Sequence, residues 1–221
     1  LADKGNGNYY YIDTQREAQK VLVSELGSVL FTIAKDVKLQ IEFNPAQVKA
    51  YRLIGYENRM LAKEDFNDDT KDAGELGVGH TVTALYEIVP AGSDEQFGKV
   101  DALKYQATTV APSEELMTVK LRYKLPEEET SKLITKAIKN SDIRQANVSD
   151  NLKFSSAVAE FGLLLRSSKH KGNANYTQVL TRAKEVLGQD PWGYRAEFIQ
   201  LVEKASALGQ PGEIRFKGST P

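Results

Sequence analysis

The sequence predicts an α+β protein, with an antiparallel β-rich sheet or sandwich followed by a C-terminal helical subdomain. Residues 37–43 and 117–125 predict the sheet, because their apolar and polar side chains alternate with the period of a half-buried strand. Residues 126–208 predict the helices, because their apolar side chains recur at the spacing of one helical face. A shorter strand and helix precede the sheet in residues 1–29.

Residues 1–29 are typical of the end of an α/β domain. A strand is expected within residues 4–13, and the spacing of Thr14 and Glu17 predicts a capping box at the start of an amphipathic helix. Gly27 is the expected stop of that helix. An amphipathic helix without its own domain exposes an apolar stripe, so we expect this one to dock on the β domain or on a neighbouring copy.

Residues 30–125 predict five strands with local connections. After the strand at 37–43, Asn44 and Pro45 break the pattern, and a second strand over 48–56 is expected to form a hairpin-like pair with the first. Residues 57–79 predict a long surface loop with a helical turn at 60–63. Further strands are expected at 80–88, 102–109 and 117–125.

Residues 126–221 predict the helical subdomain and a tail. Pro126 and three glutamates favour the first turn of a helix with apolar residues at 133, 134, 137 and 138. Residues 210–221 predict an extended tail with an edge strand at 213–216. Capping residues set the other helix limits: Ser149 or Asp150, Asn175 and Asp190 at the starts, Gly188 and Gly209 at the ends.

Composition excludes several classes of protein. Lys and Arg number 29 against 30 Asp and Glu, a balance that predicts neither nucleic-acid binding nor attraction to an anionic membrane. The chain has no cysteine, which excludes thiol catalysis, disulfides and thiolate-bound zinc. No apolar run reaches the ~20 residues of a membrane-spanning helix, so we expect no membrane insertion.

The acidic loop, residues 65–75, holds the best candidate metal ligands, Asp65, Asn67 and Asp69. Clustered carboxylate and amide oxygens on a loop are what Ca²⁺ requires. The match to an EF-hand is partial, because Thr70 stands at the position of the tight-turn glycine and Leu76 at that of the bidentate glutamate. The alternative is a solvated acidic loop balanced by neighbouring lysine and arginine side chains.

No catalytic constellation appears, and we expect no enzyme and no cofactor. The two histidines, His80 and His170, are isolated, and a general base needs an orienting partner and a substrate pocket. The glycines of residues 74–79 lack the lysine and Ser/Thr ending of a phosphate loop. Strand tyrosines such as Tyr51 and Tyr86 are expected to be mostly core.

Four segments together resemble the C-terminal half of a family of bacterial von Willebrand factor type A domain proteins. They are residues 5–14, 30–45, 51–59 and 79–87. The resemblance implies that residues 1–29 are the last strand and helix of a truncated A-type domain and that the rest is a domain of uncharacterised function. It also implies export to the cell envelope or periplasm, often as a lipoprotein. The Asp-x-Ser-x-Ser metal loop of A domains is absent from this sequence.

The leading expectation is therefore a non-catalytic module that binds or positions another protein, either a separate partner or its own upstream A domain. One alternative is a Ca²⁺-responsive domain that uses the acidic loop. A second alternative is a carbohydrate-binding sandwich, because β-sandwiches host many functions.

Overall fold

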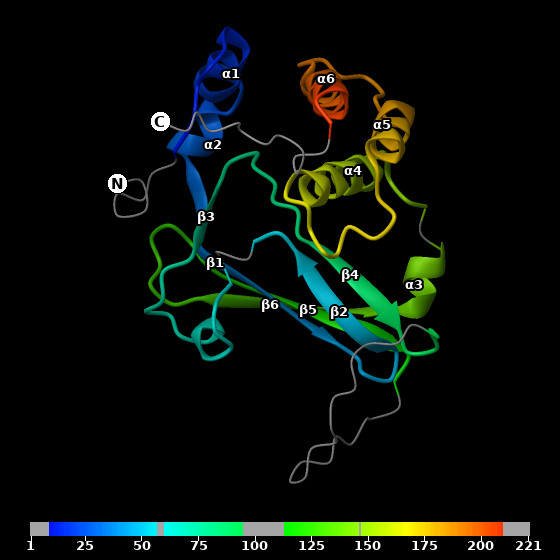
Figure 1. Ribbon diagram of the computed structural model, residues 1–221. Helices are drawn as coiled ribbons and strands as arrows, with labels where there is room; N and C mark the ends of the chain where they lie inside the picture. Colours follow the sequence, from blue (N-terminus) through cyan, green and yellow to red (C-terminus); the bar gives the residue numbers. More distant parts are fainter. Residues whose placement is uncertain (1–8, 57–59, 95–112, 146, 210–221) are drawn as a thin grey trace, which may run out of the picture. The chain divides into compact units, whose positions relative to one another are not determined.

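The computed structural model describes residues 9–56, 60–94, 113–145 and 147–209 and confirms the α+β class (Figure 1). The chain divides into two compact units. The sheet unit comprises Leu1–Arg52 and Tyr56–Gln145, and the helical unit comprises Leu53–Gly55 and Ala146–Pro221.

The sheet unit contains the strands and the first helices. In chain order its elements are α1 (Gln15–Gln19), the π-helical η2 (Lys20–Ser24), α2 (Leu26–Leu30), β1 (Thr32–Phe43), β2 (Val48–Ile54), the 3₁₀ turn η4 (Glu64–Phe66), β3 (Gly74–Gly77), β4 (Leu85–Pro90), β5 (Glu115–Lys124), β6 (Lys132–Lys139) and α3 (Asn140–Gln145).

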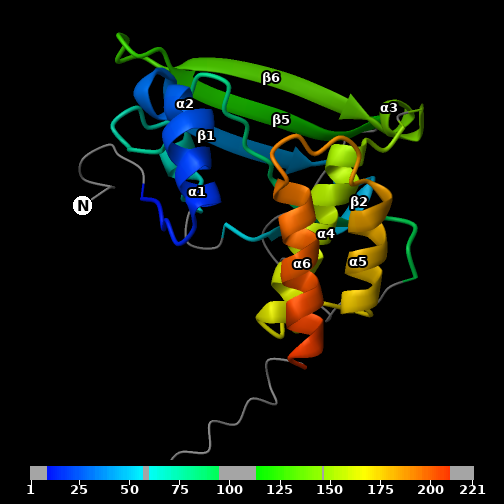
Figure 2. The same cartoon turned by 90° about the horizontal axis from the view of Figure 1, so that it is seen from above.

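A four-stranded antiparallel sheet with the order β3-β1-β5-β6 forms the centre of this unit (Figures 1 and 2). The register pairs Leu39 with Leu121 and Ile41 with Val119, so these apolar side chains share one face. Lys38 is paired with Arg122 on the opposite face. The strands predicted at 37–43 and 117–125 are therefore confirmed, with β1 starting five residues earlier than expected.

The predicted hairpin between the first two strands is wrong, because β2 pairs with β4 in a separate two-stranded sheet. Asn44 explains the outcome. Its side-chain amide donates to the carbonyl of Glu115 at 2.7 Å, and its backbone N–H donates to the carbonyl of Leu116 at 2.9 Å. These bonds hold the end of β1 to β5. The ring of Phe43 contacts those of Tyr51 and Tyr86, with centroids 4.5 and 5.6 Å away.

The helix predicted after Pro126 is also wrong: residues 132–139 form β6. The apolar positions 133, 134, 137 and 138 fit a helical face, but they fit the two faces of a strand equally well. Pairing with the long strand β5 decides between them, with Leu121 opposite Ile134 and Met117 opposite Ile138. Residues 126–139, predicted as part of the helical subdomain, accordingly belong to the sheet unit.

Residues 57–94 differ from the prediction in detail. The expected surface loop contains a short strand, β3, which pairs with β1, and its helical turn lies at residues 64–66. The strand expected at 80–88 begins only at Leu85. The strands expected at 102–109 and 213–216 lie outside the described residues. Of the strand expected within 4–13, residues 9–13 are described and are not a strand.

The N-terminal helix begins as predicted, because the hydroxyl of Thr14 accepts the N–H of Glu17 at 3.1 Å. Gly27 is not its stop, since it lies within α2. α2 packs on β3, but two residues of the apolar stripe that was expected to dock, Leu22 and Leu26, stay exposed. The approach is so close that a Cβ at Gly77 would overlap the carbonyl oxygen of Ser28.

The helical unit contains α4 (Asp150–Leu165), α5 (Tyr176–Glu185) and α6 (Tyr194–Ala207). Ser149 and Asn175 cap α4 and α5 as predicted. Asp190 does not start a helix but accepts the N–H of Ala196 through its carboxylate, and α6 begins after Gly193. The core comprises Ala157, Leu164, Val179, Ala183, Ile199 and Val202. No helix in the described part of the chain is long and apolar enough to cross a membrane.

Candidate functional site

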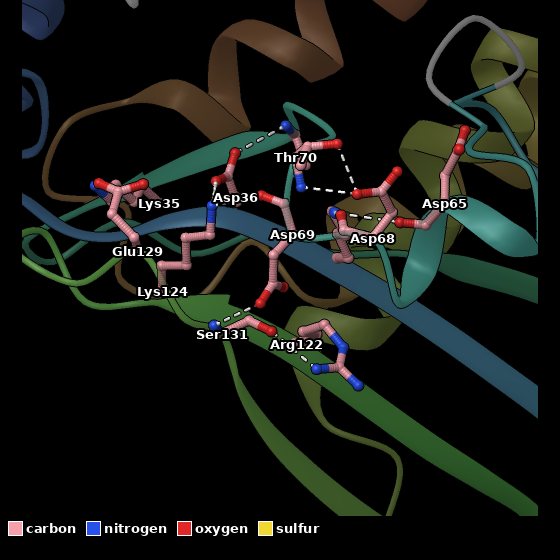
Figure 3. A network of polar contacts seen from close by, with 12 residues as sticks. Lys35, Asp36, Asp65, Asp68, Asp69, Thr70, Arg122, Lys124, Glu129 and Ser131 are labelled. Carbon is pink, nitrogen blue, oxygen red and sulfur yellow. Dashed lines mark hydrogen bonds and ion pairs between the residues drawn. The ribbon is translucent and has the colours of Figure 1, made fainter.

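Two lysines, Lys38 on β1 and Lys124 on β5, are buried. Figure 3 shows Lys124 within a network of polar contacts. The side chains of both lysines lie against the acidic loop. Lys38 is only 2% exposed and Lys124 is 5% exposed, which is uncommon for lysine. A buried ammonium group must be hydrogen-bonded, so its partners show what the site is built to hold.

The ammonium group of Lys38 is held by backbone carbonyls of the acidic loop. It donates to the carbonyl oxygen of Asp68 at 2.5 Å and to that of Asp65 at 3.2 Å. Carbonyl oxygens that converge on a positive charge are also what a bound cation requires. In this protein the cation is the lysine side chain itself, and the bonds fix the loop to β1.

Lys124 makes the second attachment. Its ammonium group lies 2.8 Å from the carboxylate of Asp36 and donates to the carbonyl of Asp69 at 2.7 Å. Asp36 has a positive φ of 52° at an irregular step of β1, and its carboxylate also accepts the N–H of Ala73 at 3.2 Å. The hydrogen bond with Asp36, opposed by partial burial, raises the pKa of Lys124. Two lysines and one aspartate thus attach the loop to the sheet.

The predicted metal ligands lie in this loop, but the side chain of each one is paired with a different residue. The carboxylate of Asp65 lies 3.6 Å from Lys71, and the side-chain oxygen of Asn67 accepts from Arg122 at 3.0 Å. The carboxylate of Asp69 accepts the N–H of Ser131 at 3.1 Å. Among the described residues no three His, Cys, Asp or Glu side chains gather as a metal site would require.

Two carboxylates of the loop have altered acidity. Hydrogen bonds from the side chain and backbone of Thr70 lower the pKa of Asp68 below its usual value. Hydrogen bonds from Ser131 lower the pKa of Asp69 in the same way, with help from the charges of Lys124 and Arg122. Both carboxylates are therefore held in the charged form and serve as hydrogen-bond acceptors.

The histidines are separate from this network. The backbone N–H of His80 donates to the carbonyl of Gly77 in the turn after β3, and His170 lies between α4 and α5. The two histidines thus belong to different compact units of the chain. Tyr51 is 58% exposed beside Phe43, while burial and the neighbouring Tyr51 raise the pKa of Tyr86.

An exposed apolar surface covers the helical segment at the start of the sheet unit. We call it the helical patch; it comprises Leu22, Val23, Leu26, Leu30 and Phe31, each between 42% and 67% exposed. Leu22 and Val23 lie in η2, and Leu26 and Leu30 lie in α2, so the patch extends over both helical elements. The sequence predicted an apolar stripe here, but only Val21 of η2 is buried against the protein.

The sequence interpretation missed Lys38 and Lys124. Both occupy the polar positions of alternating strands, where a lysine is expected to face solvent. One signal could have found them. An acidic loop that follows a strand carrying a lysine on its polar face supplies enough negative charge and carbonyl oxygen to cover that lysine.

Comparison with known proteins gives the family. Residues 28–208 match the family described as "Uncharacterized protein YfbK, C-terminal". The chain belongs to this family. It is 45% identical over 212 residues to the uncharacterised protein YfbK of Escherichia coli strain K12, an alignment that covers 94% of this chain and 36% of that protein. The chain thus spans about a third of the length of this curated relative. No solved structure matches it significantly.

Family membership agrees with part of the resemblance stated from the sequence. The relative is uncharacterised, and its matching region is a C-terminal one. The family match covers residues 28–208, and neither comparison names an A-type domain. Neither comparison names an enzyme, a metal or a partner.

Proposed function

We propose that this member of the YfbK C-terminal family is a non-catalytic module that binds or positions another protein. The helical patch carries the proposal. Contiguous apolar side chains on a water-soluble surface are costly to leave in water and mark sites of protein contact. Four of the five patch residues are more than half exposed.

The expected occupant is an A-type domain or a separate envelope protein, an assignment that rests on the family resemblance. Residues 1–29 are the part of the chain that the resemblance assigns to an A domain, and three residues of the patch, Leu22, Val23 and Leu26, lie on its helical segment. A helix taken from an α/β domain buries one face against the sheet of that domain. The apolar face left open here is the face such a domain would cover.

Calorimetric titration of this chain with the part of Escherichia coli YfbK outside the matched region tests the proposal. We expect saturable binding that the double variant L22D/L30D weakens at least a hundredfold, because two carboxylates would be buried in an apolar contact. The matched control is Leu201→Asp on α6, since Leu201 is comparably exposed at 51%. Equal loss of binding in both variants, or unchanged affinity in L22D/L30D, would contradict the proposal.

The proposed location is the bacterial envelope, again by resemblance. Fractionation of the source bacterium with an antibody against this chain addresses it. Recovery of the protein in the periplasmic or membrane fraction supports an envelope module. Recovery in the cytoplasmic fraction alone would remove the envelope from the proposal and leave protein binding to be tested by titration.

A further inference from the structure

The strand β6 forms one edge of the four-stranded sheet (Figure 2). Seven of its eight residues are exposed, on both faces of the strand. Leu133 is 48% exposed and Ile134 is 52% exposed, although they point to opposite faces. An edge strand leaves half of its backbone N–H and C=O groups without a partner strand. β6 is eight residues long, which is long enough to accept another strand.

The register identifies which backbone groups of β6 point outward. The carbonyl of Leu116 accepts the N–H of Asn44, and an irregularity follows, after which Met117 pairs with Ile138. Met117 lies opposite Phe43 of β1, and the bond from Asn44 to Leu116 beside this pair makes it a non-hydrogen-bonded one. Met117 therefore presents its backbone groups to β6. Ile138 then faces β5, and the alternation along a strand turns Ala137, Thr135 and Leu133 outward.

One observation at the end of β6 supports this assignment. The N–H of Lys139, also outward by the same alternation, donates to the carboxylate of Asp142 on α3 at 3.0 Å and not to β5. No described residue bonds the outward backbone groups of Leu133, Thr135 or Ala137. The backbone N–H and C=O groups of these three alternate residues can therefore bond to an added strand.

The side chains of β6 select the charge of that strand. Lys132 and Lys136 share a face with Ile134 and Ile138, so lysine and isoleucine alternate along it. Lys132 has an ion pair with Glu128 at 3.0 Å, but both groups are close to half exposed, so this pair is weak. An added strand with acidic residues opposite the lysines would gain cross-strand ion pairs.

The same pattern disfavours a second copy of this chain. In the two-fold antiparallel arrangement that stacks Ile134 on its own copy, Lys132 lies opposite Lys136 of that copy. Like charges directly opposite one another destabilise a strand pair. Two β6 strands that pair isoleucine with isoleucine thus also place lysine opposite lysine.

We infer that β6 binds an extended acidic segment of another protein as a fifth, antiparallel strand. Acidic side chains lie opposite Lys132 and Lys136, and β-branched side chains lie opposite Ile134 and Ile138. Main-chain bonds at Leu133, Thr135 and Ala137 supply the affinity, and the lysines supply the selectivity. β6 and the helical patch share no residue, so each proposal can be tested without the other.

The test titrates the full ¹⁵N-labelled chain with the peptide Thr-Val-Thr-Glu-Thr-Val-Thr-Glu, which places valine opposite both isoleucines and glutamate opposite both lysines. We expect amide shifts centred on β6 and saturable binding. Lys136→Glu should weaken this peptide about tenfold, and replacing only the peptide's first glutamate, the one opposite residue 136, by lysine should restore affinity to that variant.

Thr135→Pro separates strand addition from simple charge attraction. Proline removes an outward N–H but no bond to β5, so the sheet is retained while the added strand is blocked. Thr135→Val is the matched control, because it keeps the N–H and the β-branched shape. We expect loss of binding of at least tenfold for Thr135→Pro and less than twofold for Thr135→Val.

Three results would overturn the inference. One is unchanged binding in Thr135→Pro with its sheet amides intact, and another is equal affinity for acidic and lysine-substituted peptides. The third is absence of binding to the wild-type chain, which would leave the lysines as protection of the edge against aggregation.

Discussion

Replacing Lys38 by methionine should loosen the acidic loop and destabilise the sheet unit. Methionine matches the length of the lysine stem but donates no hydrogen bond. The carbonyls of Asp65 and Asp68 would lose a charged donor at 3.2 and 2.5 Å. Hydrogen bonds to a charged group contribute about 1.5–3 kcal/mol each. Both loop residues are partly open to water, which can replace part of the lost hydrogen bonding. We therefore expect the free energy of unfolding of the sheet unit to fall by about 3 kcal/mol.

Native-state hydrogen exchange of the β1 and β5 amides measures this loss in the unit concerned. The only tryptophan, Trp192, belongs to the helical unit, so its fluorescence in urea reports the other unit and should change far less. Lys136→Met, at an exposed position of β6, is the control and should cost under about 0.5 kcal/mol. A Lys38→Met protein as stable as this control would refute the view that Lys38 holds the loop.

Three further predictions concern the same unit. Gly77→Ala should displace α2, because the new methyl group overlaps the Ser28 carbonyl; limited proteolysis should then cut residues 14–30 faster, and an unchanged cleavage rate would contradict the close approach. Ca²⁺ should leave the melting midpoint where EDTA leaves it, since Lys38 and Lys124 occupy the loop carbonyls, whereas a saturable rise would favour the Ca²⁺-responsive alternative. The pKa of Asp69 is lower in the folded chain than in the unfolded chain, so its contribution to stability is present above pH ~4 and disappears as the pH falls through the folded value. Asp69→Asn should therefore flatten the acid side of the stability profile, as measured by urea unfolding at several pH values, and an unaltered profile would show that Asp69 does not contribute.

The parts of the fold that depend on local signals could be predicted from the sequence. Ser149 and Asn175 bond the backbone three residues ahead, so the cap and the helix it starts are adjacent in the chain. Strands β1 and β5 show themselves by strict alternation over seven or more residues. These features require no knowledge of what lies across the sheet.

The parts that depend on distant partners could not. The segment Leu133–Ile138 satisfies both a helical and a strand pattern, and only its pairing with β5 chooses the strand. β3 is four residues long and contains two glycines, too short a pattern to recognise before its partner is known. The burial of Lys38 likewise follows from a loop about 30 residues further along the chain.

The candidate site was predicted at the level of a loop but not of its role. The sequence directs attention to Asp65, Asn67 and Asp69 because oxygen-rich loops can hold metal. Their actual partners, among them Arg122 and Ser131, lie 55 and 62 residues away in the chain. Side-chain composition cannot distinguish a loop that binds a metal ion from one whose oxygen atoms already accept hydrogen bonds from a lysine.

The strand order of the sheet also sets the order in which the protein can fold. β1 joins β3 through residues 43 apart in the chain and joins β5 through residues 78 apart, as between Glu42 and Lys120. Contacts of such long range form slowly and leave strands exposed until their partners arrive. During synthesis β3 becomes available to β1 after about 40 further residues and β5 only after about 80. The helical unit, in contrast, closes through contacts between consecutive helices. β1 and β5 are the two inner strands of the sheet, so one side of β1 stays unpaired until β5 has left the ribosome. In this interval β1 is the segment most open to chaperones or to mispairing.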